Sequence, residues 1–114
     1  MSETETVLQE IFAEMPGHLN AEAAEGVDCV IQHALEADDD GGYGGGNYFV
    51  TIKDGVCQVS EGVHESPSMT LTMKGKDFIA LTHGELDGME AFMGGKLRIA
   101  GDMSLAMKMQ SFFG

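Results

Sequence analysis

Apolar and polar positions recur along this chain in short blocks, and the period of each block predicts one structural element. Near the start, the apolar residues have the spacing of one helix face. They are Val7, Leu8, Ile11, Phe12 and Met15. The dipeptide Pro16-Gly17 ends this helix. A second short helix is expected over residues 21–25, with Asn20 as its N-cap and Gly26 at its end.

Five further blocks alternate with the period of two that is typical of strands. They cover residues 27–36, 47–53, 56–61, 69–73 and 96–100. The dipeptide Asp54-Gly55 predicts a two-residue hairpin turn between the second and third strands. The side chains expected to face the protein interior include Cys29, Ile31, His33, Leu35, Met69, Leu71, Met73, Leu97 and Ile99.

The stretch from Gly75 to Gln110 is rich in large, soft apolar side chains. Two short helices, one strand and a final helix over residues 103–113 fit it. In that final helix, Ser104, Lys108 and Ser111 form one narrow polar stripe. The other positions are apolar apart from Gln110. We therefore expect protein or a bound molecule to cover this helix on nearly all sides.

The order of elements predicts an α+β fold, with helices covering one face of a largely antiparallel five-stranded sheet. We expect about five helices. The chain has 114 residues, 43% of them hydrophobic, with no internal repeat and no linker. This length suits one domain over residues 1–114 that has its own core.

The same C-terminal half resembles the sterol carrier protein 2 family of non-specific lipid-transfer proteins. The resemblance lies in Asp77-Phe78, Gly84, Leu86, Ala91-Phe92-Met93, Gly95-Lys96-Leu97, Ile99, Gly101-Asp102-Met103, Leu105-Ala106-Met107-Lys108 and Gln110. Residues 1–74 resemble the family more loosely, in the order of their elements. The resemblance implies a hydrophobic, lipid-holding tunnel between sheet and helices. The sequence departs from the family at Asp87-Gly88, where a proline is common. It departs also at Glu85 and Glu90, where basic residues are common; this disfavours docking on anionic membranes.

Methionine is unbranched and polarizable, so it packs around ligands of varied shape. The chain has nine methionines, and seven of them lie at or after Met69. An ordinary core would also explain them, but the family resemblance favours a tunnel lining. Gln110 is either exposed or a partner for a lipid hydroxyl or headgroup. The residues expected to line the tunnel are Met69, Leu71, Met73, Phe78, Leu81, Met89, Phe92, Met93, Leu97, Ile99, Met103, Met107 and Gln110.

These features favour a small intracellular carrier of a lipid-like ligand: a fatty acyl group, acyl-coenzyme A, a phospholipid, an isoprenoid or a sterol. The alternative is a non-catalytic accessory or dimerisation module that presents an apolar substrate to an enzyme. We expect a monomer or homodimer with transient membrane or enzyme contacts. We expect no catalytic residues, because the sequence contains no Gly-x-Ser-x-Gly elbow and no basic partner near either cysteine. We also expect no cofactor.

The net charge of −13 changes the list of partners. Residues 1–52 contain no Lys or Arg, which argues against nucleic acid and against tight binding to anionic lipid surfaces. No apolar run is long enough to span a bilayer, and the acidic N-terminus is unlike a signal peptide. With a C-terminus that lacks a peroxisomal address, the sequence suggests a cytoplasmic protein from a bacterium or archaeon. Cys29 and Cys57 are expected to be buried free thiols.

Two other motifs carry no chemistry. His18, His33, His64 and His83 lack the spacing of metal ligands, so no metal site is expected. The glycine-rich segment over residues 41–46 lacks the Lys-Ser/Thr end of a phosphate-binding loop and follows three aspartates. We therefore reject a phosphate site there.

Overall fold

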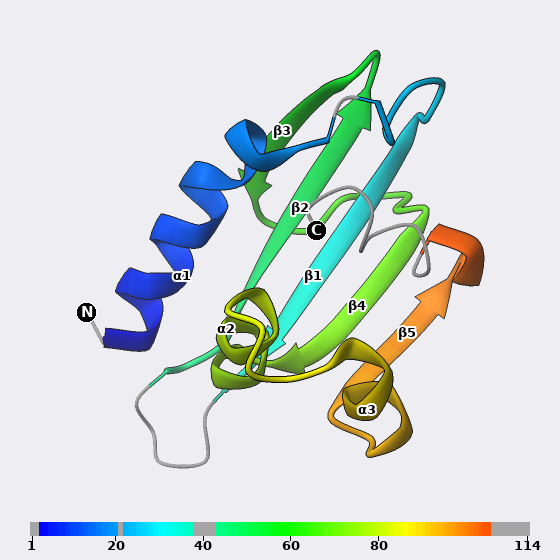
Figure 1. Cartoon of the computed structure of the whole chain (residues 1–114). Coiled ribbons are helices and arrows are strands. Elements are labelled where there is room, and N and C mark those ends of the chain that lie inside the picture. Colours follow the sequence, from blue (N-terminus) through cyan, green and yellow to red (C-terminus); the bar gives the residue numbers. More distant parts are fainter. Residues whose placement is uncertain (1–2, 21, 38–42, 106–114) are drawn as a thin grey trace.

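The computed structural model describes residues 3–20, 22–37 and 43–105, and a five-stranded sheet forms its centre (Figure 1). The strands are β1 (Cys29–Glu36), β2 (Gly46–Lys53), β3 (Val56–Glu61), β4 (Met69–Lys74) and β5 (Leu97–Gly101). Their order across the sheet is β3-β2-β1-β4-β5. β1 and β4 are parallel, and the other neighbouring pairs are antiparallel. The predicted α+β class and the mostly antiparallel sheet are confirmed.

The helices lie on one face of this sheet (Figure 1). They are α1 (Glu3–Glu14), the 3₁₀ helix η1 (Met15–His18), α2 (Gly75–Thr82) and α3 (Gly88–Met93). α1 lies toward the β2–β3 side and contacts α2, whereas α3 lies against β5. Leu8 and Phe12 of α1 are buried against the sheet, which confirms the predicted inner face of this helix.

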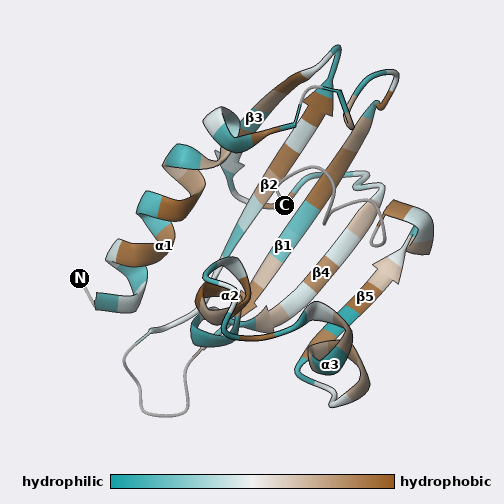
Figure 2. Cartoon of the chain, viewed as in Figure 1, coloured by the Kyte–Doolittle hydropathy of each residue, from teal (hydrophilic) through white to brown (hydrophobic). Residues whose placement is uncertain are grey.

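Apolar and polar residues alternate along β2 and β4, as Figure 2 shows. In β4, the buried positions are Met69, Leu71 and Met73, and the residues between them are partly exposed. The β2–β3 hairpin turns at Asp54 and Gly55, whose φ angles are 54° and 75°. Two successive positive φ angles are the mark of a type I′ turn, so the predicted hairpin is confirmed.

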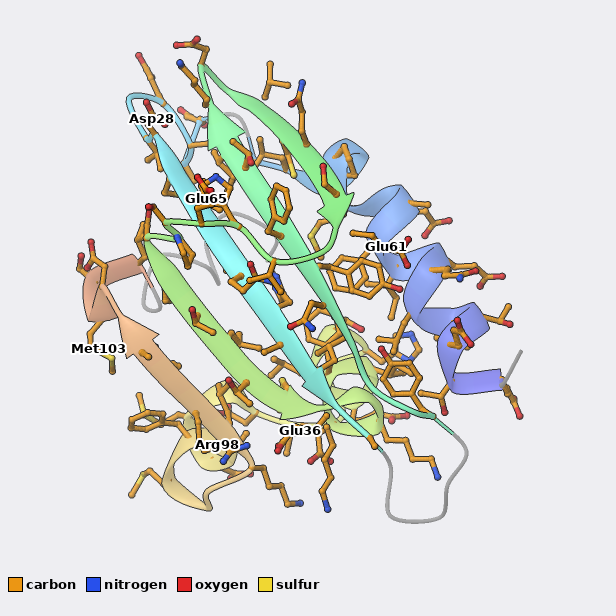
Figure 3. All side chains as sticks on the ribbon, turned by 180° about the vertical axis from the view of Figure 1, so that it is seen from behind. Asp28, Glu36, Glu61, Glu65, Arg98 and Met103 are labelled. Carbon is orange, nitrogen blue, oxygen red and sulfur yellow. The ribbon has the colours of Figure 1, made fainter. Side chains whose placement is uncertain are left out.

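The segment between β3 and β4 crosses the other face of the sheet, as Figure 3 shows from behind. Gln32 anchors this crossing from the middle of β1. Its Nε2 donates to the backbone oxygens of Tyr48 at 3.2 Å and Gly62 at 3.0 Å. Its Oε1 accepts from the backbone N–H of His64 at 2.8 Å. Gln32 is buried, and all its bonds hold strand or crossover backbone.

The helices differ from the prediction in number. We expected about five, and the residues that the structure describes form four, η1 included. Residues 22–26 form a turn instead of the helix expected over 21–25. Asn20 does cap this turn, since its Oδ1 accepts from the N–H of Glu22 and Ala23. Gly26 then takes a φ of 74°, so the segment ends before a second helical turn can form. The expected final helix lies largely outside the described residues, which include only its start, up to Leu105.

Candidate functional site

The helix-covered face of the sheet is an apolar floor built from cross-strand rows. The strand register places the neighbours Tyr48, His33, Leu71 and Ile99 in one row, Val59, Val50, Ile31 and Met69 in a second, and Leu35, Met73 and Leu97 in a third. All of these side chains are buried except Val59 and Ile99, which are partly buried. His33 is therefore a titratable side chain in the middle of an otherwise apolar layer.

An aromatic cluster connects this floor to the helices above it. We define the cluster as Phe12 of α1, Phe78 of α2, and Tyr48 and His33 of the sheet. The Phe12 ring stacks on Tyr48 with centroids 4.2 Å apart and on Phe78 at 5.3 Å. His33 meets the rings of Phe12 and Phe78 edge to face, at 5.4 Å and 5.3 Å. Such pairs each add about 0.5–1.5 kcal/mol beyond the burial of area, so the cluster ties both helices to the sheet.

His33 is chemically unusual for its position. Its Nδ1 is buried and has no hydrogen-bond partner in the part of the chain that the structure describes. Burial lowers the pKa of His33 to about 4, although a hydrogen bond with the Ile31 backbone acts in the opposite direction. The imidazole is therefore neutral near pH 7. It places one unsatisfied polar atom in an apolar layer, an arrangement that normally costs stability.

An open groove of about 300 Å³ lies between α1 and the β2–β3 strands. It is lined by Gln9, Phe12, Ala13, Tyr48, Val59 and Glu61. Two of these residues, Phe12 and Tyr48, belong to the aromatic cluster, so the groove reaches the buried layer. Figure 3 shows Glu61 on the side where β3 approaches α1. Burial raises the pKa of Tyr48, and the negative charges of Glu61 and Glu5 raise it further. This end of the groove therefore has a negative electrostatic potential.

The structure separates the predicted lining residues into three groups. The first group packs in or against the core: Met69, Leu71, Met73, Phe78, Leu81, Leu97 and Ile99. The second group is exposed to solvent: Met89, Phe92, Met93 and Met103. The third, Met107 and Gln110, lies outside the described residues. The role of all three groups in ligand binding stays a prediction. Of the first group, Phe78 and Leu81 belong to α2, and the other five residues lie on β4 and β5 in the sheet floor.

We did not predict roles for Phe12, Tyr48 and His33. The sequence carried a signal for each of them. Phe12 stands on the apolar face of the first helix, and Tyr48 starts the alternation of the second strand. His33 occupies an inward position between Ile31 and Leu35. A titratable residue on an apolar strand face is either a satisfied core group or part of a site. Only the structure shows that the Nδ1 of His33 has no hydrogen-bond partner among the described residues.

The cysteines and other polar side chains form no reactive centre within the described ranges. Cys29 and Cys57 are both buried, and no disulfide joins them, as predicted. Burial, together with nearby Cys29, raises the pKa of the Cys57 thiol to about 11, which keeps it protonated and unreactive. Among residues 3–20, 22–37 and 43–105, no three His, Cys, Asp or Glu side chains gather as metal ligands would. No helix in these ranges has the length and hydropathy to cross a bilayer.

A mixed five-stranded sheet, helices on one face and an apolar layer between them define an α+β domain of the sterol-carrier type. The sequence agrees with this class. Residues 8–114 match the SCP-2 sterol transfer family, and the chain belongs to this family, which is known for lipid binding and transfer.

Two longer animal proteins and one single-domain structure illustrate the relatives. The chain is 32% identical to hydroxysteroid dehydrogenase-like protein 2 of Xenopus tropicalis over 99% of this chain and 26% of that protein. It is 35% identical to sterol carrier protein 2 of Rattus norvegicus over 89% of this chain and 19% of that protein. The chain thus spans about a quarter or less of these curated relatives. The solution structure of palmitated SCP2L2 from Aedes aegypti has a TM-score of 0.70, 28% identity, and coverage of 96% of this chain and 91% of that one.

Proposed function

We propose that this chain carries one lipid-like molecule whose hydrocarbon part lies in the layer between α1, α2 and the sheet. The observation that carries this proposal is the groove of about 300 Å³ whose lining includes the aromatic-cluster residues Phe12 and Tyr48. Small-molecule sites in proteins span about 300–1,000 Å³ and are mostly apolar. The groove is therefore large enough to hold one end of an alkyl chain.

The floor beyond the groove suits the rest of such a chain. Met69, Leu71 and Met73 lie next to β1 in this layer, and methionine side chains adjust their shape at low cost. The Nδ1 of His33 would give a ligand oxygen one hydrogen bond, once the Phe12 ring moves aside. Membership of a lipid-binding family supports this use of the layer.

The charges beside the groove favour a neutral head group over an anionic one. Glu61 lines the groove, Glu5 and Glu61 both act on Tyr48, and the whole chain carries a charge of −13. The Aedes aegypti relative is described as palmitated, which is a precedent for a sixteen-carbon chain. For the present protein we favour a ligand of similar length with a hydroxyl or another neutral head, because a carboxylate or coenzyme A phosphate would be repelled.

Displacement of a neutral fluorescent probe tests this proposal. The protein is saturated with N-phenyl-1-naphthylamine, and 1-hexadecanol or palmitate is added at pH 8 and low salt. We expect saturable probe binding, with stronger displacement by the alcohol than by the carboxylate. Raising the ionic strength should reduce the difference in probe displacement between 1-hexadecanol and palmitate. Absence of saturable binding overturns the proposal, and better displacement by palmitate overturns the assignment of a neutral head.

A matched pair of variants places the ligand. Ala13 lines the groove from α1 and is exposed, so Ala13→Trp fills the groove without disturbing the core. We expect probe affinity to fall at least tenfold. Ala100 is also exposed but lies on β5, away from the groove, so Ala100→Trp should bind as the unmodified chain does. Equal affinities for the two variants would place the ligand elsewhere.

A second candidate function is that of a module that presents an apolar substrate to an enzyme. The observation that favours it is length, because this chain covers only 26% and 19% of the two curated relatives named above. Such a module would still bind the probe, but it would act only beside a catalytic partner. Transfer of hexadecanol between vesicles by the isolated chain would favour the carrier. Retention of the ligand until a partner enzyme is added would favour the module.

We further propose a cytoplasmic, reducing location. The two buried thiols, which form no disulfide with each other, support it. Origin in a bacterium or archaeon stays a prediction, since the relatives named above are animal proteins.

A further inference from the structure

The large apolar side chains of helix α3 face solvent, whereas those of an ordinary surface helix face the core. Successive residues of an α-helix are rotated by about 100°. Met89, Phe92 and Met93 therefore lie within one arc of about 100°, and Ala91 lies roughly opposite them. The three large side chains are 63%, 42% and 80% exposed, whereas Ala91 is only 1% exposed. We call these three residues the α3 patch.

Hydrogen bonds hold both ends of helix α3 in place. The Asp87 side chain accepts hydrogen bonds from the N–H of Met89 at 2.8 Å and of Glu90 at 3.3 Å. At the other end, Lys96 N–H donates to the Ala91 oxygen at 2.8 Å. The α3 patch is thus presented by a capped helix that packs on β5. An exposed apolar group of this kind on an ordered element indicates an interaction surface.

The α3 patch lies in the electrically neutral part of the chain. Residues 74–98 contain four basic and four acidic residues, so the rest of the chain carries the whole net charge of −13. Lys96 is exposed directly after α3, and Arg98 pairs with Glu36 across the sheet at 2.6 Å. By contrast, α1 carries four glutamates and no basic residue. Of these two surfaces, only the one around α3 can approach lipid phosphates without net repulsion.

We propose that the α3 patch docks on a zwitterionic lipid bilayer, with Met89, Phe92 and Met93 inserted at the boundary between head groups and acyl chains. A stable protein partner would need about 20–30 residues on each side, many more than a six-residue helix offers. Surface-lying helices bind bilayers through this kind of apolar face. We favour a bilayer without net charge because the strongly acidic remainder of the chain would be repelled by an anionic surface. The inference goes beyond the proposed ligand binding, and its test needs no ligand.

The chain contains no tryptophan, so one substitution creates a specific reporter. Phe92→Trp places an indole in the α3 patch. With phosphatidylcholine vesicles we expect a blue shift of its emission and quenching by brominated phosphatidylcholine. Val63→Trp is the matched control, because Val63 is 72% exposed in the β3–β4 segment on the uncovered face of the sheet. We expect neither a shift nor quenching for the control.

Two further changes test the mechanism of docking. Met89→Gln with Met93→Gln, made in the Phe92→Trp chain, should lower the vesicle partition coefficient at least tenfold, because two exposed apolar side chains are lost. Both positions are exposed, so thermal unfolding should be unchanged. Replacing part of the phosphatidylcholine by phosphatidylglycerol at low salt should weaken binding. No blue shift with phosphatidylcholine, an equal shift in the control, or a shift that appears only with an added protein each overturns the proposal. Unchanged probe binding in those cases leaves the carrier function standing.

Discussion

At the scale of single residues, His33 couples the apolar layer to pH. Its folded pKa of about 4 lies below the ordinary value of 6.5, so the unfolded chain binds the proton more tightly. The stability from neutral His33 is therefore complete above about pH 6.5 and falls as the pH drops toward 4. The shift corresponds to about 3 kcal/mol. We expect His33→Gln to remove about this much of the pH dependence between pH 7 and pH 4.

Urea unfolding at several pH values measures this difference directly. The carboxylates titrate in both proteins, so their contribution cancels in the comparison. Parallel stability curves for the two proteins would show that His33 is not buried in its neutral form. His83, which is exposed, offers a matched control, because His83→Gln should leave the curve unchanged.

The two thiols make a second prediction at this scale. Burial raises the pKa of Cys57 to about 11, and Cys29 is 4% exposed. We therefore expect that neither thiol of the folded protein reacts with Ellman's reagent at pH 8. In urea, both thiols should react rapidly. Fast reaction of one thiol in the folded protein would contradict the burial of that strand.

At the scale of elements, the start of α2 depends on a close approach between Gly75 and Tyr43. A Cβ at Gly75 would lie 2.7 Å from Cδ2 of the Tyr43 ring and 3.3 Å from Cδ1 of Leu8. Tyr43 and Gly75 are both buried. We expect Gly75→Ala to destabilise the fold by about 1–3 kcal/mol, even though alanine favours helices. Thermal or urea unfolding gives the value.

The control for this substitution is Gly17→Ala. A Cβ at Gly17 would meet no atom within 4 Å. The free energy of unfolding of the Gly17→Ala variant should therefore differ little from that of the unmodified chain. Adding Tyr43→Leu to Gly75→Ala should recover part of the loss, since the smaller side chain relieves the contact. Equal effects at Gly75 and Gly17 would show that the close packing is absent.

The sequence predicted the strands better than the site because alternation depends only on neighbours along the chain. The residues of β4 alternate strictly between apolar and polar side chains, so its inner face was clear. The turn at Gly26 was mistaken for a helix, since a cap such as Asn20 is common to both structures. For α3, the apolar residues were apparent along the chain, but no local pattern could show which side of the helix the sheet would cover. The contact of Phe12 with Tyr48 joins residues far apart in the sequence, and no local pattern encodes it.

At the scale of the whole molecule, the groove and the α3 patch lie toward opposite edges of the sheet. The helix layer on one face of the sheet encloses the apolar floor, and the groove opens beside α1. Helix α3 packs on β5, the strand at the opposite edge of the sheet, and its patch faces solvent. A carrier with this arrangement would approach a bilayer through its neutral side while its acidic helix α1 faces water.

The central claim is that the layer between helices and sheet holds a lipid-like molecule, and native mass spectrometry of the protein purified from its own host tests it most directly. We predict a species heavier than the 12.2 kDa chain by the mass of one neutral amphiphile. The extra mass should disappear in organic solvent and be absent from Ala13→Trp. A spectrum with only the bare chain, together with no uptake of added hexadecanol, would contradict the account.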